Sequence, residues 1–385
     1  MDRHELNRMF DGLAPDPRRE RELLRQLLQD DVRRKRPMKN WKRAVIGAAA
    51  AALLVTGAAA AVVVPRLNQG FLDYLNVEPE DTEAVVQAED LLLPGAMELD
   101  ITKEDNGAAL HVTQVLRDRN CVMVLADFTA PEGTVLNMGD LDAPGSWMRK
   151  GFSLTSETTA CFLDEAGEPM GDGLTGYYNW EVLEDGDPLD EHLTLMLTLF
   201  PQMGETSVMD AAALRVPAVN LSYFDTEGFD SEAVYYGDWT VQIPLPQQDI
   251  GSAQQLDYAI GELDGARIVV EELYLSPMTM ELTLTREGGV DLDSWTDENE
   301  AAQIRWLSLA NDAADPNNVV LSAKDGETVS LERSAGGDVG TGRQVAVFRL
   351  SQVTDPAKFQ GGTLTLNWAC GKAVIPLNSL ALAEP

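Results

Sequence analysis

The feature that most constrains this chain is an uncharged segment of 21 residues, 44–64, which reads AVIGAAAAALLVTGAAAAVVV. A helix of this length is about 31 Å long at a rise of about 1.5 Å per residue, which matches the ~30 Å hydrocarbon core of a bilayer. Its leucine, isoleucine and valine side chains favour insertion into lipid, and Pro65 ends the helix. We therefore predict a transmembrane helix over residues 44–64.

The charges on either side of this segment predict its orientation. Residues 1–43 carry 13 basic and 8 acidic side chains and the rest carries 16 and 55, so the net charge of −34 divides into +5 and −39. Lys and Arg accumulate on the cytoplasmic side of membrane helices. We predict a single-pass protein of the cell membrane with its N-terminus in the cytoplasm and its C-terminal domains outside. The residues that determine this topology are Arg33, Arg34, Lys35, Arg36, Lys39, Lys42 and Arg43.

Two other interpretations of the apolar segment stay open. The run of alanines near its end would suit a signal peptidase, although the leader would be 43 residues long and signal peptides have apolar cores of only about 7–15 residues. The second alternative is a soluble helix rich in alanine.

The 43 residues before the apolar segment predict a basic, helical cytoplasmic arm. Asp16 and Pro17 are suited to the start of a helix. The leucines that follow lie on one face of that helix, and we predict that they bind a partner: Leu23, Leu24, Leu27 and Leu28. The partner would be a cytoplasmic protein, the anionic inner leaflet or a second copy of the arm, because a lone amphipathic helix of this length is marginal in water.

The remaining residues predict a mainly β protein. Residues 65–95 indicate a helical connector that stops at Pro94-Gly95. Beyond it, segments such as LHVTQVL, CVMVLADF, ARIVVEELYL and RQVAVFRL have the length and residue types of strands, with Gly, Pro, Asn and Asp between them and no long helical pattern. This is typical of β-sandwiches, and we predict two tandem Ig-like domains over residues 96–250 and 251–385.

An internal repeat supports the tandem arrangement. Residues 105–126 align with residues 263–284 at a constant offset of 158, and the alignment places Asn106-Gly107 on Asp264-Gly265. Both dipeptides favour two-residue type I′ hairpin turns. Chance alternation between two β segments is the remaining alternative.

The sequence contains no recognisable catalytic or cofactor motif, and we expect neither an enzyme nor a bound cofactor. It has three histidines and no HExxH, GxSxG, GxGxxG or Walker pattern.

The acidic loops 164–173, 183–191 and 291–300 are rich in the oxygen ligands that Ca²⁺ prefers, but none has the spacing of a calcium-binding loop. The three cysteines give no disulfide framework, and a Cys121–Cys161 bridge stays open.

The charge of the outer region limits its partners. A body with a net charge of −39 repels nucleic acids and anionic lipid head groups. We therefore expect no nucleic acid as a partner, and an extracellular partner that is a protein or a neutral ligand.

The chain resembles a group of anti-sigma-factor-like, single-pass envelope proteins of Gram-positive bacteria, which carry an extracellular domain of unknown function followed by a second β module. The similar segments are RPMKNWKR, FLDYL, LDITKEDNGAALHVTQVL and YLSPMTMELTLT. The resemblance implies a sensor or regulator in signal transduction whose inner arm restrains a sigma factor. Residues 1–43 contain one histidine and no cysteine, so this chain departs from the zinc-bearing type. The alternative is a structural or adhesive surface protein without a signalling role.

Overall fold

The computed structural model divides the chain into two units, Met1–Val63 and Val64–Pro385, and the residues that it describes all belong to the second. These are residues 66–78, 80–134, 136, 151–155, 159–170, 177–183, 190–201, 208–224, 231–290, 292, 300–312, 318–340 and 342–378. The predicted arm and the predicted transmembrane helix lie outside them. Within the described ranges, none of the helices has the length and apolar character needed to cross a membrane.

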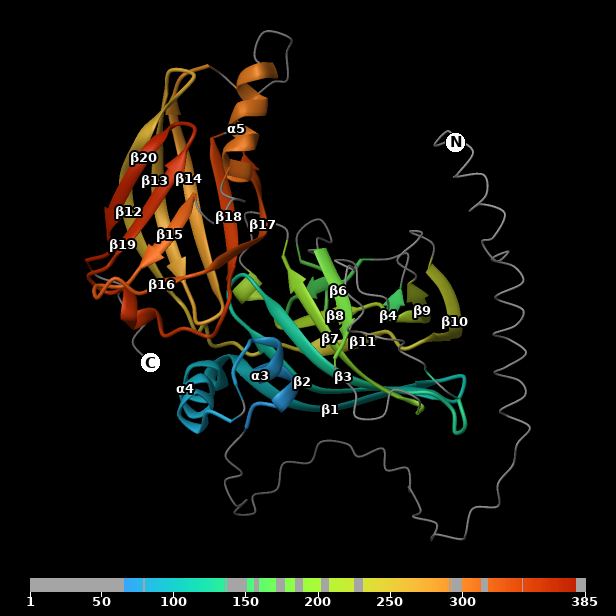
Figure 1. Ribbon diagram of the computed structural model, residues 1–385. Coiled ribbons are helices and arrows are strands. Elements are labelled where there is room, and N and C mark those ends of the chain that lie inside the picture. The colour runs from blue at the N-terminus through green and yellow to red at the C-terminus, as the bar shows by residue number, and fades with distance from the viewer. Residues whose placement is uncertain are drawn as a thin grey trace, which may run out of the picture. The chain divides into compact units, whose positions relative to one another are not determined.

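The described chain begins with the helical connector that the sequence predicts. It consists of α3 (Gln69–Tyr74), α4 (Thr82–Leu92) and the 3₁₀ turn η1 (Leu93–Gly95). Asn68 and Asp81 cap the two helices, since their side chains accept hydrogen bonds from backbone N–H groups of the first turn. Figure 1 shows both helices beside the first strands of the protein.

Three antiparallel sheets follow the connector, and we call their strands the first repeat. The largest has the order β1-β2-β3-β7-β6, formed by β1 (Ala96–Asp105), β2 (Ala108–Arg117), β3 (Val122–Thr129), β7 (His192–Phe200) and β6 (Tyr177–Val182). The second is β11-β8-β5, formed by β11 (Val241–Pro244), β8 (Ala213–Val216) and β5 (Cys161–Leu163). The third is β10-β9-β4, formed by β10 (Ser231–Asp238), β9 (Val219–Phe224) and β4 (Gly151–Thr155). The 3₁₀ turn η2 (Val208–Asp210) precedes β8.

Two further antiparallel sheets form what we call the second repeat. One has the order β12-β13-β14-β18-β17, formed by β12 (Ser252–Leu263), β13 (Ala266–Leu275), β14 (Thr279–Gly288), β18 (Arg343–Leu350) and β17 (Leu331–Gly340). The other is β16-β15-β19-β20, formed by β16 (Thr328–Val329), β15 (Val319–Ser322), β19 (Thr363–Trp368) and β20 (Gly371–Pro376). The 3₁₀ turn η3 (Pro356–Phe359) lies between β18 and β19.

The predicted sequence repeat coincides with a repeat of strand order. The five-stranded sheets match strand for strand, and β11-β8-β5 has its counterpart in β20-β19-β15. The Asn106-Gly107 and Asp264-Gly265 turns have positive φ at both positions and join directly paired strands, which confirms the two type I′ hairpins. The prediction of a mainly β protein with several sheets is therefore confirmed.

The expectation that no long helix interrupts the strands is wrong. Helix α5 (Glu300–Asp312) lies beside β17 and β18 (Figure 1). It buries Ala302, Trp306 and Leu309, which recur at helical spacing, and the side chain of Gln344 donates to the carbonyl of Trp306 at 2.7 Å. The residues between them mix polar and apolar side chains, which hides this short apolar face when the sequence is searched for alternation of period two.

Each repeat has its own apolar core, and a third apolar cluster lies under the connector. The first five residues of β3 are all apolar because both faces of the strand are covered there. Val122, Val124 and Ala126 face the core of the first repeat, whereas Met123 and Leu125 face the connector. A strand covered on both faces does not alternate. The connector is thus an integral layer of the first repeat.

Candidate functional site

The most unusual polar structure among the described residues is a buried turn at Asp118, between β2 and β3. The Asp118 side chain is 0% exposed. Its Oδ1 accepts hydrogen bonds from the backbone N–H groups of Asn120, at 2.8 Å, and Cys121, at 2.7 Å. A short side-chain acceptor of this kind takes the place of backbone pairing in a tight turn. One carboxylate oxygen therefore organises the turn itself.

The other carboxylate oxygen of Asp118 binds the equivalent turn of the second repeat. Oδ2 accepts hydrogen bonds from the hydroxyl groups of Ser276, at 2.5 Å, and Thr279, at 2.7 Å. Ser276 follows Asp118 by 158 residues, which is the offset of the sequence repeat. Ser276 Oγ also accepts from the N–H groups of Met278 and Thr279, so it organises its own turn as Asp118 does. Matching turns of the two repeats thus bind each other, and we call this contact the joint.

Burial and hydrogen bonding act in opposite directions on Asp118. Burial raises the pKa of its carboxyl group, and the hydrogen bonds from Ser276, Thr279 and the Asn120 N–H partly offset that rise. The structure places no cationic side chain in ion-pair contact with Asp118 within the described residues, so these four donors are its partners. Such a carboxylate depends on its hydrogen bonds for solvation.

The next residue, Arg119, forms the ionic part of the joint. Its guanidinium lies 2.8 Å from the carboxylate of Glu272 and 3.7 Å from that of Glu281, both in the second repeat. Burial raises the pKa of Glu281, and Arg119 opposes this rise. The guanidinium also lies 5.2 Å from the centre of the Tyr274 ring. Two acidic residues on strands of the second repeat are therefore held by one arginine of the first.

Tyr274 closes the joint on the side of the linker between the repeats. Its hydroxyl donates to Asp249 at 2.5 Å and accepts from the Arg119 N–H at 3.2 Å. A Cβ atom on Gly251 would lie 2.2 Å from that hydroxyl, so this position requires glycine. The linker residues are thus shaped around a tyrosine that contacts both repeats.

Arg117, at the end of β2, is buried and forms no ion pair with any carboxylate of the residues that the structure describes. Its guanidinium donates to the backbone carbonyls of Val208, Met209 and Ala211 at 3.1–3.4 Å. Burial lowers its pKa to about 10. It fixes η2 and the start of β8 to the strand that leads into the joint.

Gln114, also on β2, holds the first described residues of the connector. Its side-chain carbonyl accepts from the Asn68 N–H at 2.9 Å, and its side-chain amide donates to the carbonyl of Arg66 at 3.0 Å. The Gln114 side chain is buried, at 3% exposure, whereas Arg66 and Asn68 are exposed, so both contacts are partly buried. The chain at residues 66–68 is therefore fixed to the sheet by a two-point clamp.

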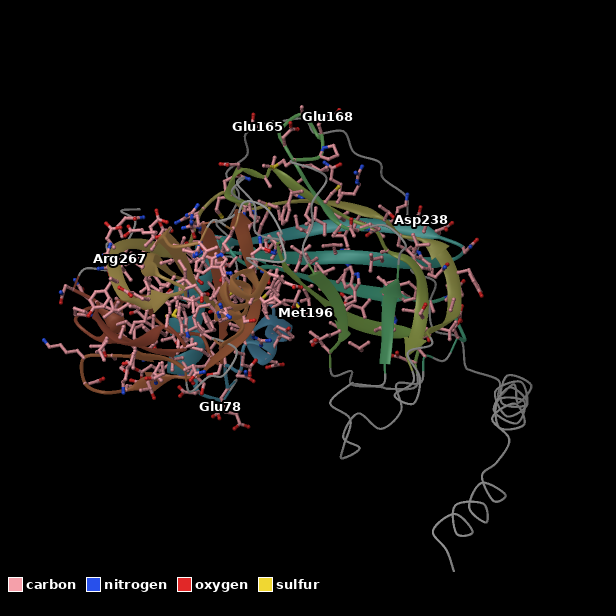
Figure 2. The ribbon with its side chains drawn as sticks, turned by 90° about the horizontal axis from the view of Figure 1, so that it is seen from above. Glu78, Glu165, Glu168, Met196, Asp238 and Arg267 are labelled. Carbon is pink, nitrogen blue, oxygen red and sulfur yellow. The ribbon has the colours of Figure 1, made fainter. Side chains whose placement is uncertain are left out.

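An apolar contact surface continues the clamp along the connector. It joins Phe71 and Leu72 of α3 to outward-facing side chains of the sheet, including Leu125 and Met196. Met196, labelled in Figure 2, lies beside the connector helices. Met278 of the joint belongs to the same cluster, so the connector and the joint share one buried surface.

The polar groups of the joint are paired with one another. Its hydroxyls and the carboxylates of Asp118 and Glu281 are buried, whereas the side chain of Arg119 is 30% exposed. The described part of the chain has no group of three His, Cys, Asp or Glu side chains placed to hold a metal ion. In the acidic loop after β5, Asp164 accepts from the N–H groups of Ala166 and Glu168, which makes it a turn-forming residue.

The residues that the sequence nominated are located as follows. The leucines Leu23, Leu24, Leu27 and Leu28 and the seven basic residues from Arg33 to Arg43 lie outside the described residues. Cys121 and Cys161 are separate buried thiols, and the Cys161 sulfur accepts from Arg215 at 3.0 Å. His111, on β2, pairs with Asp100, and His192, at the start of β7, contacts Thr129.

Sequence reasoning missed the residues that form the joint and the clamp. Asp118, Ser276 and Gln114 appear in the sequence as ordinary turn or strand residues. The one signal that pointed to the joint was the repeat offset, which aligns Asp118 with Ser276.

Comparison with known proteins assigns no identity. No known protein family matches the chain, and no curated protein does. Among solved structures, a conserved domain protein from Bacillus anthracis aligns at 14% identity and a TM-score of 0.37, over 71% of this chain and 78% of that one. The N-terminal periplasmic domain of ScsB from Proteus mirabilis aligns at 12% identity and a TM-score of 0.16, over 74% and 98%. Similarity at this level carries no argument about function.

Proposed function

We propose that this chain is a single-pass membrane protein that acts as an envelope sensor or regulator of the anti-sigma-factor-like kind. Its two repeats are Ig-like β-sandwich domains outside the cell, and its arm holds a cytoplasmic protein through the leucine face Leu23–Leu28. The supporting features are the uncharged segment 44–64, the basic cluster before it and the resemblance described above.

The clamp at Gln114 is the observation that favours a regulator over a protein that is only anchored to the membrane. Residues 66 and 68, which Gln114 binds, follow the end of the predicted membrane helix by only two and four positions. A surface protein that only needs a tether would tolerate a flexible linker here. A chain that is held from residue 66 onward would transmit a change in the position of the outer domains toward the membrane helix.

The predicted topology is tested by thiol labelling of intact cells. The three native cysteines are buried, so labelling with a membrane-impermeant maleimide reports introduced cysteines. Glu165 lies in an exposed turn (Figure 2) and Gln26 in the arm. We expect Glu165→Cys to be labelled in intact cells and Gln26→Cys only after lysis, with the wild-type chain as the blank. Labelling of Gln26→Cys in intact cells, or protection of Glu165→Cys, would refute the topology.

The role of the arm is tested by purification of the full chain from membranes. We expect a sigma factor to copurify with the wild-type chain and to be reduced at least tenfold when Leu24 and Leu27 are both replaced by Ala, because each buried leucine contributes about 2 kcal/mol or more. Gln26→Ala with Gln29→Ala is the matched control on the other face. Equal recovery from both double variants, or no sigma factor with the wild type, would contradict the proposal.

The alternative, a structural or adhesive surface protein, makes the opposite prediction for the arm. Deletion of residues 1–30 keeps the basic cluster and the apolar segment. If the protein is only adhesive, this deletion leaves its cellular phenotype unchanged.

A further inference from the structure

The connector is held by the second repeat as well as by the first. At the end of α3, the guanidinium of Arg349, on β18, donates to the carbonyl of Tyr74 at 2.8 Å and lies 4.4 Å from the centre of the Tyr74 ring. Two residues on, the side-chain amide of Asn76 donates to the carbonyl of Ser351 at 2.9 Å. These contacts span 275 residues of sequence.

Tyr74 also reaches the first repeat, because its hydroxyl accepts a hydrogen bond from Thr198, on β7, at 3.0 Å. Burial raises the pKa of this hydroxyl, so it stays neutral at physiological pH. One side chain of the connector therefore contacts both repeats at once, through its ring on one side and its hydroxyl on the other.

The backbone at this point is shaped for the contact. Asn76 has a φ of +57°, a left-handed conformation that non-glycine residues other than Asn and Asp rarely adopt. It ends α3 and turns its side chain toward the second repeat. The N–H groups of Leu75, Asn76 and Val77 all donate to carbonyls of α3, so their hydrogen exchange reports whether this end of the helix stays closed.

We infer that Arg349 and the carbonyl of Ser351 form a latch by which the second repeat holds the connector against the first. The clamp at Gln114 fixes the start of the connector, and the latch fixes the end of α3. If the repeats move apart at the joint, the latch opens and the C-terminal end of α3 loses its contacts with the second repeat. The biological role of the latch rests on the proposed function: in a sensor, the latch would make the second repeat the regulatory domain. The latch itself is independent of membrane topology.

Hydrogen exchange of the full chain, followed by mass spectrometry, tests the latch. Arg349→Ala removes a charge-assisted hydrogen bond and a cation–π contact, so we expect exchange of the amides at 75–77 to rise roughly 10- to 100-fold. Arg343→Ala is the matched control, because Arg343 lies on the same strand and pairs with Glu271 instead of the connector. Asn76→Gly, which keeps the left-handed backbone, is expected to give a smaller rise in the same amides.

Three outcomes would overturn the latch. The first is equal exchange at 75–77 in Arg349→Ala and Arg343→Ala. The second is a uniform rise across β2 and β13 in Arg349→Ala, which would make Arg349 a general stabilising residue. The third is an exchange rate at 75–77 in Asn76→Gly that equals the wild-type rate. Because this measurement needs neither a membrane nor a cytoplasmic partner, its failure is separate from failure of the labelling or copurification experiments.

Discussion

Replacing Asp118 by Ala is expected to lower the free energy of unfolding of the two repeats by about 3–5 kcal/mol. The change leaves the hydroxyls of Ser276 and Thr279 and the N–H groups of Asn120 and Cys121 without their acceptor in a dry site. Each unsatisfied buried donor costs about 1–3 kcal/mol, and relaxation of the turn recovers part of that sum. Urea denaturation followed by circular dichroism measures the loss.

Two variants give this prediction its controls. Asp164→Ala removes an aspartate that also accepts two N–H groups in a turn, but in an exposed one, so we expect a loss below about 1 kcal/mol. Asp118→Asn keeps one carbonyl oxygen to accept from the two N–H groups but loses the acceptor of the Ser276 and Thr279 hydroxyls, so its loss should fall between those of the two alanine variants. Equal losses for Asp118→Ala and Asp164→Ala would show that the joint contributes nothing beyond its turn.

Replacing Phe71 by Ala is expected to undock the connector while the sheets stay folded. Phe71 is 0% exposed and is among the largest side chains in the cluster between the connector and the sheet. A buried Phe→Ala change costs about 3–5 kcal/mol. Because the connector covers one face of the sheet and contributes no strand, this cost falls on local opening. Native-state proteolysis should therefore show cleavage within residues 66–92 that is about 100-fold faster or more.

Val86→Ala is the matched control for the connector. Val86 lies on α4 and is 51% exposed, so its truncation should leave the cleavage rate within a factor of about two. Cleavage that begins in the strands rather than in residues 66–92 of Phe71→Ala would mean that connector and sheets unfold as one unit.

Several elements were predictable from the sequence because their signals are local. The two type I′ turns follow from Asn-Gly and Asp-Gly, which accept positive φ at both central positions. Strands β2, β13 and β18 follow from runs rich in β-branched and aliphatic residues. Strand β12 escaped prediction because it lies at a sheet edge, where half of its residues are exposed and few apolar side chains mark the face that packs on the core.

The joint, the clamp and the latch were not predictable, and Asp118 shows why. An aspartate between two strands is a common turn residue, and nothing near it in the sequence distinguishes it from Asp164. What distinguishes the two is that Asp118 binds Ser276 of the second repeat, whereas the partners of Asp164 among the described residues belong to its own turn. In the same way, Arg349 looks like an ordinary strand residue in the sequence, and only the fold shows that its guanidinium lies over the ring of Tyr74.

By itself, then, the sequence determined that most apolar segments become strands, that residues 105–126 recur after 158 residues, and that one uncharged segment separates a basic arm from an acidic body. Only the tertiary structure decided that equivalent turns of the two repeats bind each other and that both repeats hold the connector. The reason is that periodicity and turn propensity act over a few neighbouring residues. A buried hydrogen bond between distant residues depends instead on where the whole chain brings its donor, its acceptor and the apolar groups that exclude water.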